Sequence, residues 1–296
     1  MLRWFEKFPE SVIKNHANLS IIYAWNLMMI GSLKDIEIHL DNAQLALEKG
    51  VGLELVPSPG VPTYTLNEMR FQRINLALRA LLASMEGDTG RAIELGQQTL
   101  ALSTDRDISL RLSVLQALSM AYRLEGRVKE AFALAQSLIK LVEPFESADL
   151  TASAWAYLGM SYVLMGRLRQ ARHSYEAGLD SYSTLPNCFS QPGRIAQPIT
   201  EGQLYQLIGA LLYEQNDLEG ALTCLRKSIA ISIYYRANES TVETYLSLTQ
   251  LHLAQNDQAT ALITLEQAEQ TADIQSASRI KSRVAAFRAR FDLRMG

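Results

Sequence analysis

The sequence predicts an all-α fold, a right-handed α-α superhelix, or solenoid, assembled from helical hairpins. Three observations predict this class. Amphipathic helical segments recur at intervals of about 40 residues, a turn-forming residue precedes each of them, and small residues recur at two fixed positions around each turn. A fixed period of roughly 20 to 50 residues is typical of solenoids, in which each repeat packs mainly on its neighbours.

The turn residues define the repeat. They are Gly31, Gly87, Gly126, Gly166, Asn216 and Asn256. Three of the intervals between them are nearly equal (126 − 87 = 39, 166 − 126 = 40 and 256 − 216 = 40). The two longer intervals contain proline-rich segments at 51–64 and 184–199, and proline is excluded from helix interiors. We therefore expect two loop insertions in a single solenoid domain that covers residues 1–296.

Each repeat is expected to form a first helix, a turn and a second helix. Small residues stand seven positions before the turn, at Ala24, Ala80, Ser119, Gly159, Gly209 and Thr249. Alanine stands five positions after it, at Ala92, Ala131, Ala171, Ala221 and Ala261. Large residues stand nine positions after it in four repeats, at Leu40, Tyr175, Leu225 and Leu265. Small residues facing one another let two helices approach closely, and the large residue fills the remaining gap.

The turns themselves carry a local signal. Glycine or asparagine suits the left-handed conformation that ends many helices. In the Asn-Asp pairs at 216–217 and 256–257, the aspartate is also placed to cap the first amides of the next helix.

Two repeat classes fit this pattern. A tetratricopeptide unit has ~34 residues, whereas HEAT and armadillo units have ~40 to 47. The alanine and small-residue positions favour a tetratricopeptide-like hairpin, as do Tyr122 and Tyr162, the aromatic residues four positions before the turn. The extra length is then assigned to longer helices and longer loops between hairpins.

Composition excludes several function classes. The 28 Lys and Arg and 31 Asp and Glu residues are interspersed and give a net charge of −3, so no basic surface for direct nucleic-acid binding is expected. The longest apolar stretch is far shorter than the ~20 residues of a membrane span, and no signal peptide is recognisable. The two cysteines, Cys188 and Cys224, show neither zinc-ligand spacing nor a disulfide framework. We expect a cytoplasmic protein.

Catalytic motifs are also missing from the sequence. It contains no GxxxxGK[ST], HExxH, GxSxG or GxGxxG segment. The four histidines fall in four different repeats, at His16, His39, His173 and His252. The sequence therefore predicts a binding protein that is not an enzyme and has no cofactor and no metal site.

Two segments resemble a known family. The first lies near the start of the chain and includes Phe8-Pro9, Leu19-Ser20 and Ala24-Trp25. The second is the stretch 203–290, in which the Leu-Leu-Tyr-Glu-x-Asn-Asp-Leu block at 211–218 is the most specific part. They resemble the tetratricopeptide-like sensor region of MalT-like, LuxR-type ATP-dependent transcription regulators. The resemblance implies effector sensing and signal transduction, next to an NTPase module and a helix-turn-helix module in a longer parent chain. ATP hydrolysis and DNA binding are not expected of this segment.

The ligand is expected on the concave face, which the first helices of the hairpins line. Repeat position places eight residues near this groove: Gln116, Met120, Arg123, Met160, Gln206, Tyr213, Glu243 and Gln250. Two function classes remain open. One is a sensor that recognises a small effector or a regulatory protein, and the other is a stand-alone scaffold that docks a peptide or helix.

Overall fold

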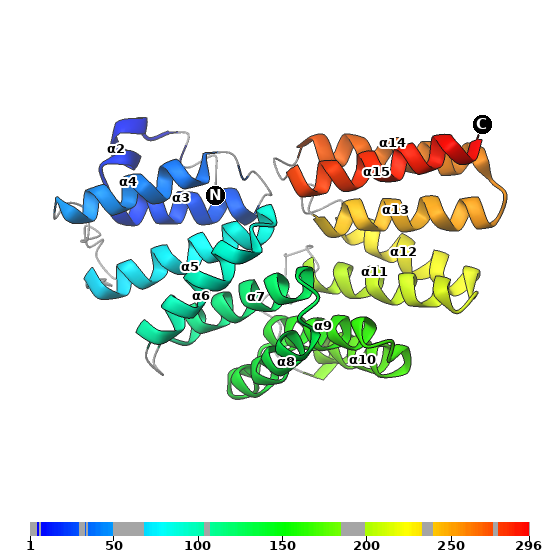
Figure 1. The fold of residues 1–296 in the computed structure, drawn as a ribbon, viewed down its shortest axis with the longest axis horizontal. Helices are drawn as coiled ribbons and strands as arrows, with labels where there is room; N and C mark the ends of the chain where they lie inside the picture. Colours follow the sequence, from blue (N-terminus) through cyan, green and yellow to red (C-terminus); the bar gives the residue numbers. More distant parts are fainter. Residues whose placement is uncertain are drawn as a thin grey trace. The chain divides into compact units, whose positions relative to one another are not determined.

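The computed structural model describes residues 5, 7–29, 33, 35–49, 68–103, 107–184, 199–232, 239–274 and 278–295. The chain divides into two compact units, Met1–Ala121 and Tyr122–Gly296, which we describe separately. The helices of the first unit are α2 (Glu10–Lys14), α3 (Ala17–Met29), α4 (Ile36–Glu48), α5 (Glu68–Glu86), α6 (Thr89–Leu102) and most of α7 (Ile108–Leu124). Within it, α3 pairs with α4 and α5 pairs with α6 (Figure 1).

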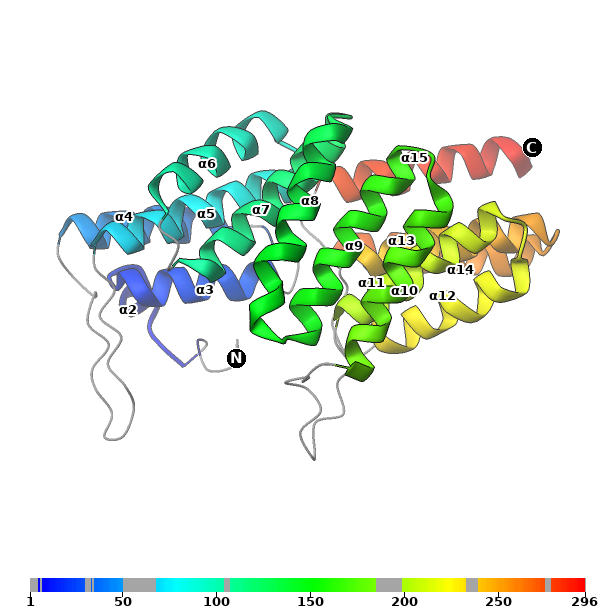
Figure 2. The same ribbon diagram turned by 90° about the horizontal axis from the view of Figure 1, so that it is seen from below.

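The second unit contains the end of α7 and eight further α-helices. These are α8 (Val128–Val142), α9 (Ala148–Leu164), α10 (Leu168–Thr184), α11 (Ile199–Glu214), α12 (Leu218–Ser232), α13 (Glu239–Ala254), α14 (Gln258–Ile274) and α15 (Ser278–Met295). A short 3-10 turn, Glu143–Phe145, follows α8. Helices α9 and α10, α11 and α12, and α13 and α14 pack as three successive hairpins (Figures 1 and 2).

The predicted all-α solenoid of tetratricopeptide-like hairpins is confirmed. The described residues contain fourteen α-helices and no strand. The first helices of successive hairpins, α9, α11, α13 and then α15, each pack on the next. We call these four elements the A helices of the second unit.

The hairpin turns have the predicted geometry. Gly87, Gly126, Gly166, Asn216 and Asn256 all have positive φ, between 60° and 89°. The amide of the residue after each turn residue donates to a carbonyl five residues earlier at 2.8 to 2.9 Å, which is the Schellman closure of a helix end. The predicted turn positions from 87 onward are therefore helix ends fixed by backbone conformation.

Aspartates next to the turns cap the second helices, as expected. Asp217 Oδ1 accepts from the Gly220 amide at 2.9 Å, and Asp257 Oδ1 accepts from the Thr260 amide at 3.1 Å. Asp88 caps α6 in the same way. Each bond satisfies an amide at a helix start that has no partner within the helix.

Small residues and large residues face one another inside the hairpins. A Cβ atom on Gly159 of α9 would overlap the ring of Tyr175 on α10. One on Gly209 of α11 would lie 2.8 Å from Cγ of Leu225 on α12. The small position before the turn therefore receives the large residue that follows it, as predicted.

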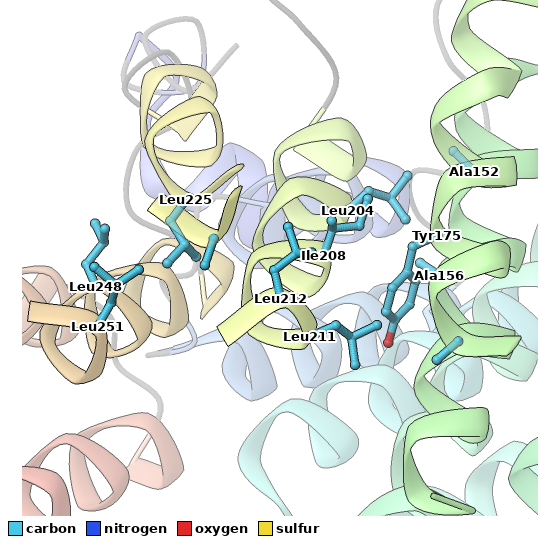
Figure 3. Packing of buried hydrophobic residues seen from close by; sticks show 12 residues of the cluster. Ala152, Ala156, Tyr175, Leu204, Ile208, Leu211, Leu212, Leu225, Leu248 and Leu251 are labelled. Carbon is cyan, nitrogen blue, oxygen red and sulfur yellow. The ribbon is translucent and has the colours of Figure 1, made fainter. Parts of the chain in front are cut away.

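The core of the second unit continues from hairpin to hairpin. Tyr175 lies against Ala152 and Ala156 of α9 and beside Leu211 of α11, while Leu248 and Leu251 extend the apolar layer into α13 (Figure 3). Burial of this contiguous apolar surface, at roughly 25 cal/mol per Å², is the main force that stacks the hairpins.

Several sequence predictions lie outside the described residues. These are the first turn at Gly31, nearly all of the two proposed insertions at 51–64 and 184–199, and Cys188. Cys224, on α12, is a free thiol. None of the described helices is long and apolar enough to cross a membrane. The prediction that residues 1–296 form one solenoid domain stays a prediction.

Candidate functional site

A cavity of about 460 Å³ opens on the A helices of the second unit. Its wall contains Met160 of α9, Leu207 and Tyr213 of α11, Gln250 of α13 and Arg283 of α15, among others. A volume of this size is within the range of ligand sites in proteins, roughly 300 to 1,000 Å³.

The repeat explains why these residues meet. Met160, Ala210 and Gln250 each stand six positions before a turn residue (166 − 6, 216 − 6 and 256 − 6), and all three line the cavity. Leu207 and Ser247 stand nine positions before the turn and also line it. Positions six and nine are three residues apart, so they lie on one face of each A helix. When the hairpins stack, equivalent residues of successive A helices therefore line the same cavity.

Arg123, at the end of α7, supplies a cation to this cavity. Its Nη1 donates to the sulfur of Met160 at 3.0 Å. No carboxylate in the part of the chain that the structure describes lies within ion-pair distance of it. Burial lowers the pKa of the Arg123 guanidinium, but arginine keeps its charge in proteins. The Glu239 carboxylate acts on Arg123 only through a Coulombic interaction beyond ion-pair distance, so no ion pair neutralises this charge in the described structure.

Tyr175, from α10, contributes a second polar group. The side chain is 1% exposed, and its hydroxyl has no hydrogen-bond partner among the described residues. It lines the same cavity as Arg123. Burial raises the pKa of this phenol strongly, so the hydroxyl stays protonated and remains a donor.

A second cavity of about 410 Å³ adjoins the first and lies between α13 and α15. The two cavities share Ser247, Gln250 and Arg283. In the second cavity, Arg283 Nη2 pairs with Glu243 Oε2 at 2.7 Å. Burial raises the pKa of the Glu243 carboxyl, although Arg283 opposes the shift. These two charges are paired with each other, in contrast to Arg123, whereas Arg290, which also lines this cavity, is exposed.

The structure brings five of the eight predicted residues together. Arg123, Met160, Tyr213 and Gln250 line the first cavity, and Glu243 and Gln250 line the second. Gln206 of α11 is only 8% exposed and lines neither. The remaining two, Gln116 and Met120, belong to the first unit. Which of the eight residues bind a ligand stays a prediction.

Sequence reasoning did not select several of the lining residues. The apolar ones are Leu207, Ala210 and Leu211, which look like ordinary core residues in the sequence. The charged ones are Glu214 and Arg283. The repeat position of Arg283 gave a signal, because it stands 40 residues after Glu243 (283 − 243 = 40). The period that located the turns would therefore have located Arg283 as well.

The first unit has a cavity of its own, of about 490 Å³. It is lined in part by Phe5, Lys14, Tyr23 and His39, and by none of the eight predicted residues. Lys14 is paired there with Glu10 at 2.7 Å. His39 packs edge-on against Tyr23, and burial lowers its pKa, which favours the neutral imidazole. The Lys14 ammonium group of this cavity is thus already paired.

Metal ligands do not cluster in the part of the chain that the structure describes. No group of three or more His, Cys, Asp or Glu side chains there is arranged to hold an ion. The prediction of a protein without a metal or cofactor stays a prediction.

Sequence comparison identifies one family. Residues 75–296 match the model of the MalT-like TPR region, which covers all of the second unit and the end of the first. No curated protein sequence matches the chain.

Three solved structures have a similar fold. The Rap protein complexed with Competence and Sporulation Factor has a TM-score of 0.64 at 12% identity and covers 98% of this chain and 79% of its own. NprR in complex with its cognate peptide NprX has a TM-score of 0.59 at 12% identity, with 97% and 74% covered. The apo form of RapI has a TM-score of 0.56 at 10% identity, with 95% and 99% covered. At such identities the likeness shows the fold alone.

Proposed function

Because this chain belongs to the family of MalT-like TPR regions, we propose that it is the effector-binding region of a transcription regulator. In this proposal it catalyses no reaction and binds a peptide segment of its partner on the A helices of the second unit. Binding there biases the regulator between a resting and an active state.

One observation carries the choice of a peptide. The two adjoining cavities share Ser247, Gln250 and Arg283, and together they extend across α9, α11, α13 and α15. An extended peptide covers ~3.3 Å per residue and can follow a run of equivalent positions on stacked helices. A compact ligand would occupy only one of the two cavities.

The fold comparison supports this choice. NprR has a similar fold and was solved with its cognate peptide NprX. Peptide docking in a helical groove is also a common mode of recognition. The stand-alone scaffold, the other function class open from sequence, would use the same surface.

A small effector is the second candidate. The first cavity alone, at about 460 Å³, has the volume of a small-molecule site and combines apolar walls with a few polar groups. The two candidates differ in the second cavity, which only an extended ligand reaches.

The proposal also concerns the longer protein. In a MalT-like regulator, an NTPase module and a DNA-binding module would be the partners of this region within one chain. The test is the reading frame of the gene, because a continuous frame that encodes both modules would support the regulator and genuine ends of the protein at residues 1 and 296 would favour the scaffold.

A thermal-shift screen tests the binding function. The purified chain is screened in two arms, one with synthetic peptides and the other with sugars, nucleotides and metabolites. A ligand at 100 times its dissociation constant stabilises the fold by ~2.7 kcal/mol, which is measurable. We expect saturable hits among the peptides.

Two matched variants locate the binding surface. Gln250→Trp places a large side chain on an exposed residue shared by both cavities. Ile263→Trp places the same side chain on α14, at a residue that is 55% exposed and lines neither cavity. We expect Gln250→Trp to abolish the shift and Ile263→Trp to leave it intact. Equal losses, or hits confined to the metabolite arm, would refute peptide binding on this surface.

A further inference from the structure

We propose that the first cavity binds a carboxylate of the peptide, held between the Arg123 guanidinium and the Tyr175 hydroxyl. The inference deepens the proposed function and rests on it. It assigns the chemistry of the partner: an acidic peptide with apolar side chains next to the carboxylate.

The Arg123 side chain makes one polar contact in the described structure, to the Met160 sulfur at 3.0 Å. A thioether is a weak acceptor, and a guanidinium has five N–H donors arranged to meet the two oxygens of a carboxylate. Desolvating an unpaired charge is costly unless an opposite charge compensates for it. Arg123 is therefore placed to gain strongly from an incoming anion.

Tyr175 provides independent support. Tyr175 lines the cavity, and its buried hydroxyl has no hydrogen-bond partner among the described residues. Figure 3 shows this hydroxyl beside Leu211, another lining residue. Each of Tyr175 and Arg123 lies close enough to influence the other electrostatically. Buried polar groups without a partner are rare in folded proteins, and two donors that share one cavity point to a shared acceptor.

The surroundings favour a carboxylate on an apolar peptide over a strongly hydrated anion. Met160, Leu207 and Leu211 line the cavity beside the two donors. Apolar walls exclude water and strengthen a charge-assisted hydrogen bond, and they also bury aliphatic side chains of the ligand. Glu214, the carboxylate on this lining, is exposed and makes no ion pair with Arg123 in the described structure.

The other cavities explain why the anion is assigned here. In the second cavity Arg283 is paired with Glu243 at 2.7 Å, and in the cavity of the first unit Lys14 is paired with Glu10 at 2.7 Å. An incoming carboxylate would have to compete with these pairs. Arg290 also lines the second cavity, but it is exposed, so water solvates its charge. Arg123 is desolvated by burial and has no competing ion pair in the described structure.

Paired peptides provide the test. An array carries synthetic peptides in matched forms, Glu against Gln and Asp against Asn within the sequence, and a free against an amidated C-terminus. The wild-type chain and its variants are titrated with every peptide that binds. We expect replacement of one carboxylate by an amide to weaken binding about 10- to 100-fold, as for loss of a hydrogen bond to a charged group.

Protein variants assign that carboxylate to Arg123. Arg123→Met should remove the preference for the acidic form, so that acidic and amide peptides bind equally, while Arg123→Lys should keep part of it. Tyr175→Phe should weaken the acidic form selectively, by less. Arg127→Met is the matched control, because Arg127 lies four residues away, is exposed and is paired with Glu130 at 2.9 Å.

The outcomes separate the two proposals. If peptides bind but tolerate every change of carboxylate to amide, or if Arg123→Met keeps the preference, the carboxylate site is wrong and the peptide-binding function stands. If no peptide binds the folded chain, the proposed function fails and the carboxylate site fails with it.

Discussion

The two units use their partly buried arginines differently. In the first unit, Arg79 of α5 donates to Glu37 and Asp41 of α4, both at 2.6 Å, and to Asn75 at 2.8 Å. In the second unit, Arg123 contacts only the sulfur of Met160 among polar partners in the described structure. Arg79 connects α5 to α4 through these hydrogen bonds, whereas Arg123 lines a cavity. The paired arginine has a structural role, and the arginine without an ion pair is the basis of the proposed carboxylate site.

The side chains that pack against helix glycines also differ between the two units. In the first unit, Gly96 of α6 makes room for Leu118 of α7, and a Cβ on Gly96 would lie 2.7 Å from a methyl carbon of Leu118. In the second unit, Gly159 makes room for the ring of Tyr175, a residue that lines the cavity. The same device positions an apolar side chain in one unit and a hydrogen-bond donor in the other.

The largest effect is expected for Gly159→Ala. The added methyl group overlaps a rigid ring that is 1% exposed, and overpacking of this kind costs about 1–3 kcal/mol. Gly96→Ala should cost less, because Leu118 can change rotamer, and the helix gains about 1 kcal/mol from alanine. Urea unfolding measures both. Gly90→Ala, with open space around it, serves as control and should be neutral or stabilising. Equal losses at Gly159 and Gly96 would contradict the rigid placement of Tyr175.

The next effect is expected for Arg79→Met. Removing the guanidinium leaves Glu37 and Asp41 without their shared partner and Asn75 without a donor. Since Glu37 and Asp41 are partly solvated and Arg91 also pairs with Glu37 at 2.7 Å, the loss should be about 1–2 kcal/mol, below that of a fully buried pair. Denaturation in low and high salt measures it. If the variant were as stable as the wild type, Arg79 would have no structural role.

Much of the fold could be predicted because its determinants are local. Positive φ at Gly126 or Asn216 depends on a single residue, and the caps at Asp217 and Asp257 depend on an amide three residues later. Because the sequence repeats, each of these local features recurs at the equivalent position of the next hairpin. A period read from the turns was therefore enough to predict the hairpins.

The site could be predicted only in part, because its contacts join helices that are distant in sequence. Met160 and Gln250, both named from repeat position, line the cavity, but Gln206, one position from Leu207, is buried. A step of one residue turns a side chain by about 100° around the helix, which is enough to move it off the lined face. Nothing local shows that Arg79 meets Glu37, 42 residues away, whereas Arg123 meets no carboxylate.

Arg123→Met should sharpen the comparison of the two arginines, because its effect on stability has the opposite sign. Replacing an unpaired, desolvated cation by an apolar side chain of similar length removes a cost and leaves no partner unsatisfied. We expect the free protein to gain about 0.5–1 kcal/mol in urea unfolding, while Arg79→Met loses stability. A loss of more than about 1 kcal/mol would show that Arg123 is structural, like Arg79.

The smallest effect is expected for Tyr175→Phe. The hydroxyl is buried and unpaired in the described structure, so its removal deletes no hydrogen bond and retains the ring that packs on Gly159. Stability in urea should change by less than about 0.5 kcal/mol, or rise slightly. Tyr162→Phe is the matched control on the neighbouring helix, where the ring stacks edge-on against Phe132 at 5.3 Å. A clear loss confined to Tyr175→Phe would mean that its hydroxyl is satisfied in the free protein, and it would then not be available to a ligand.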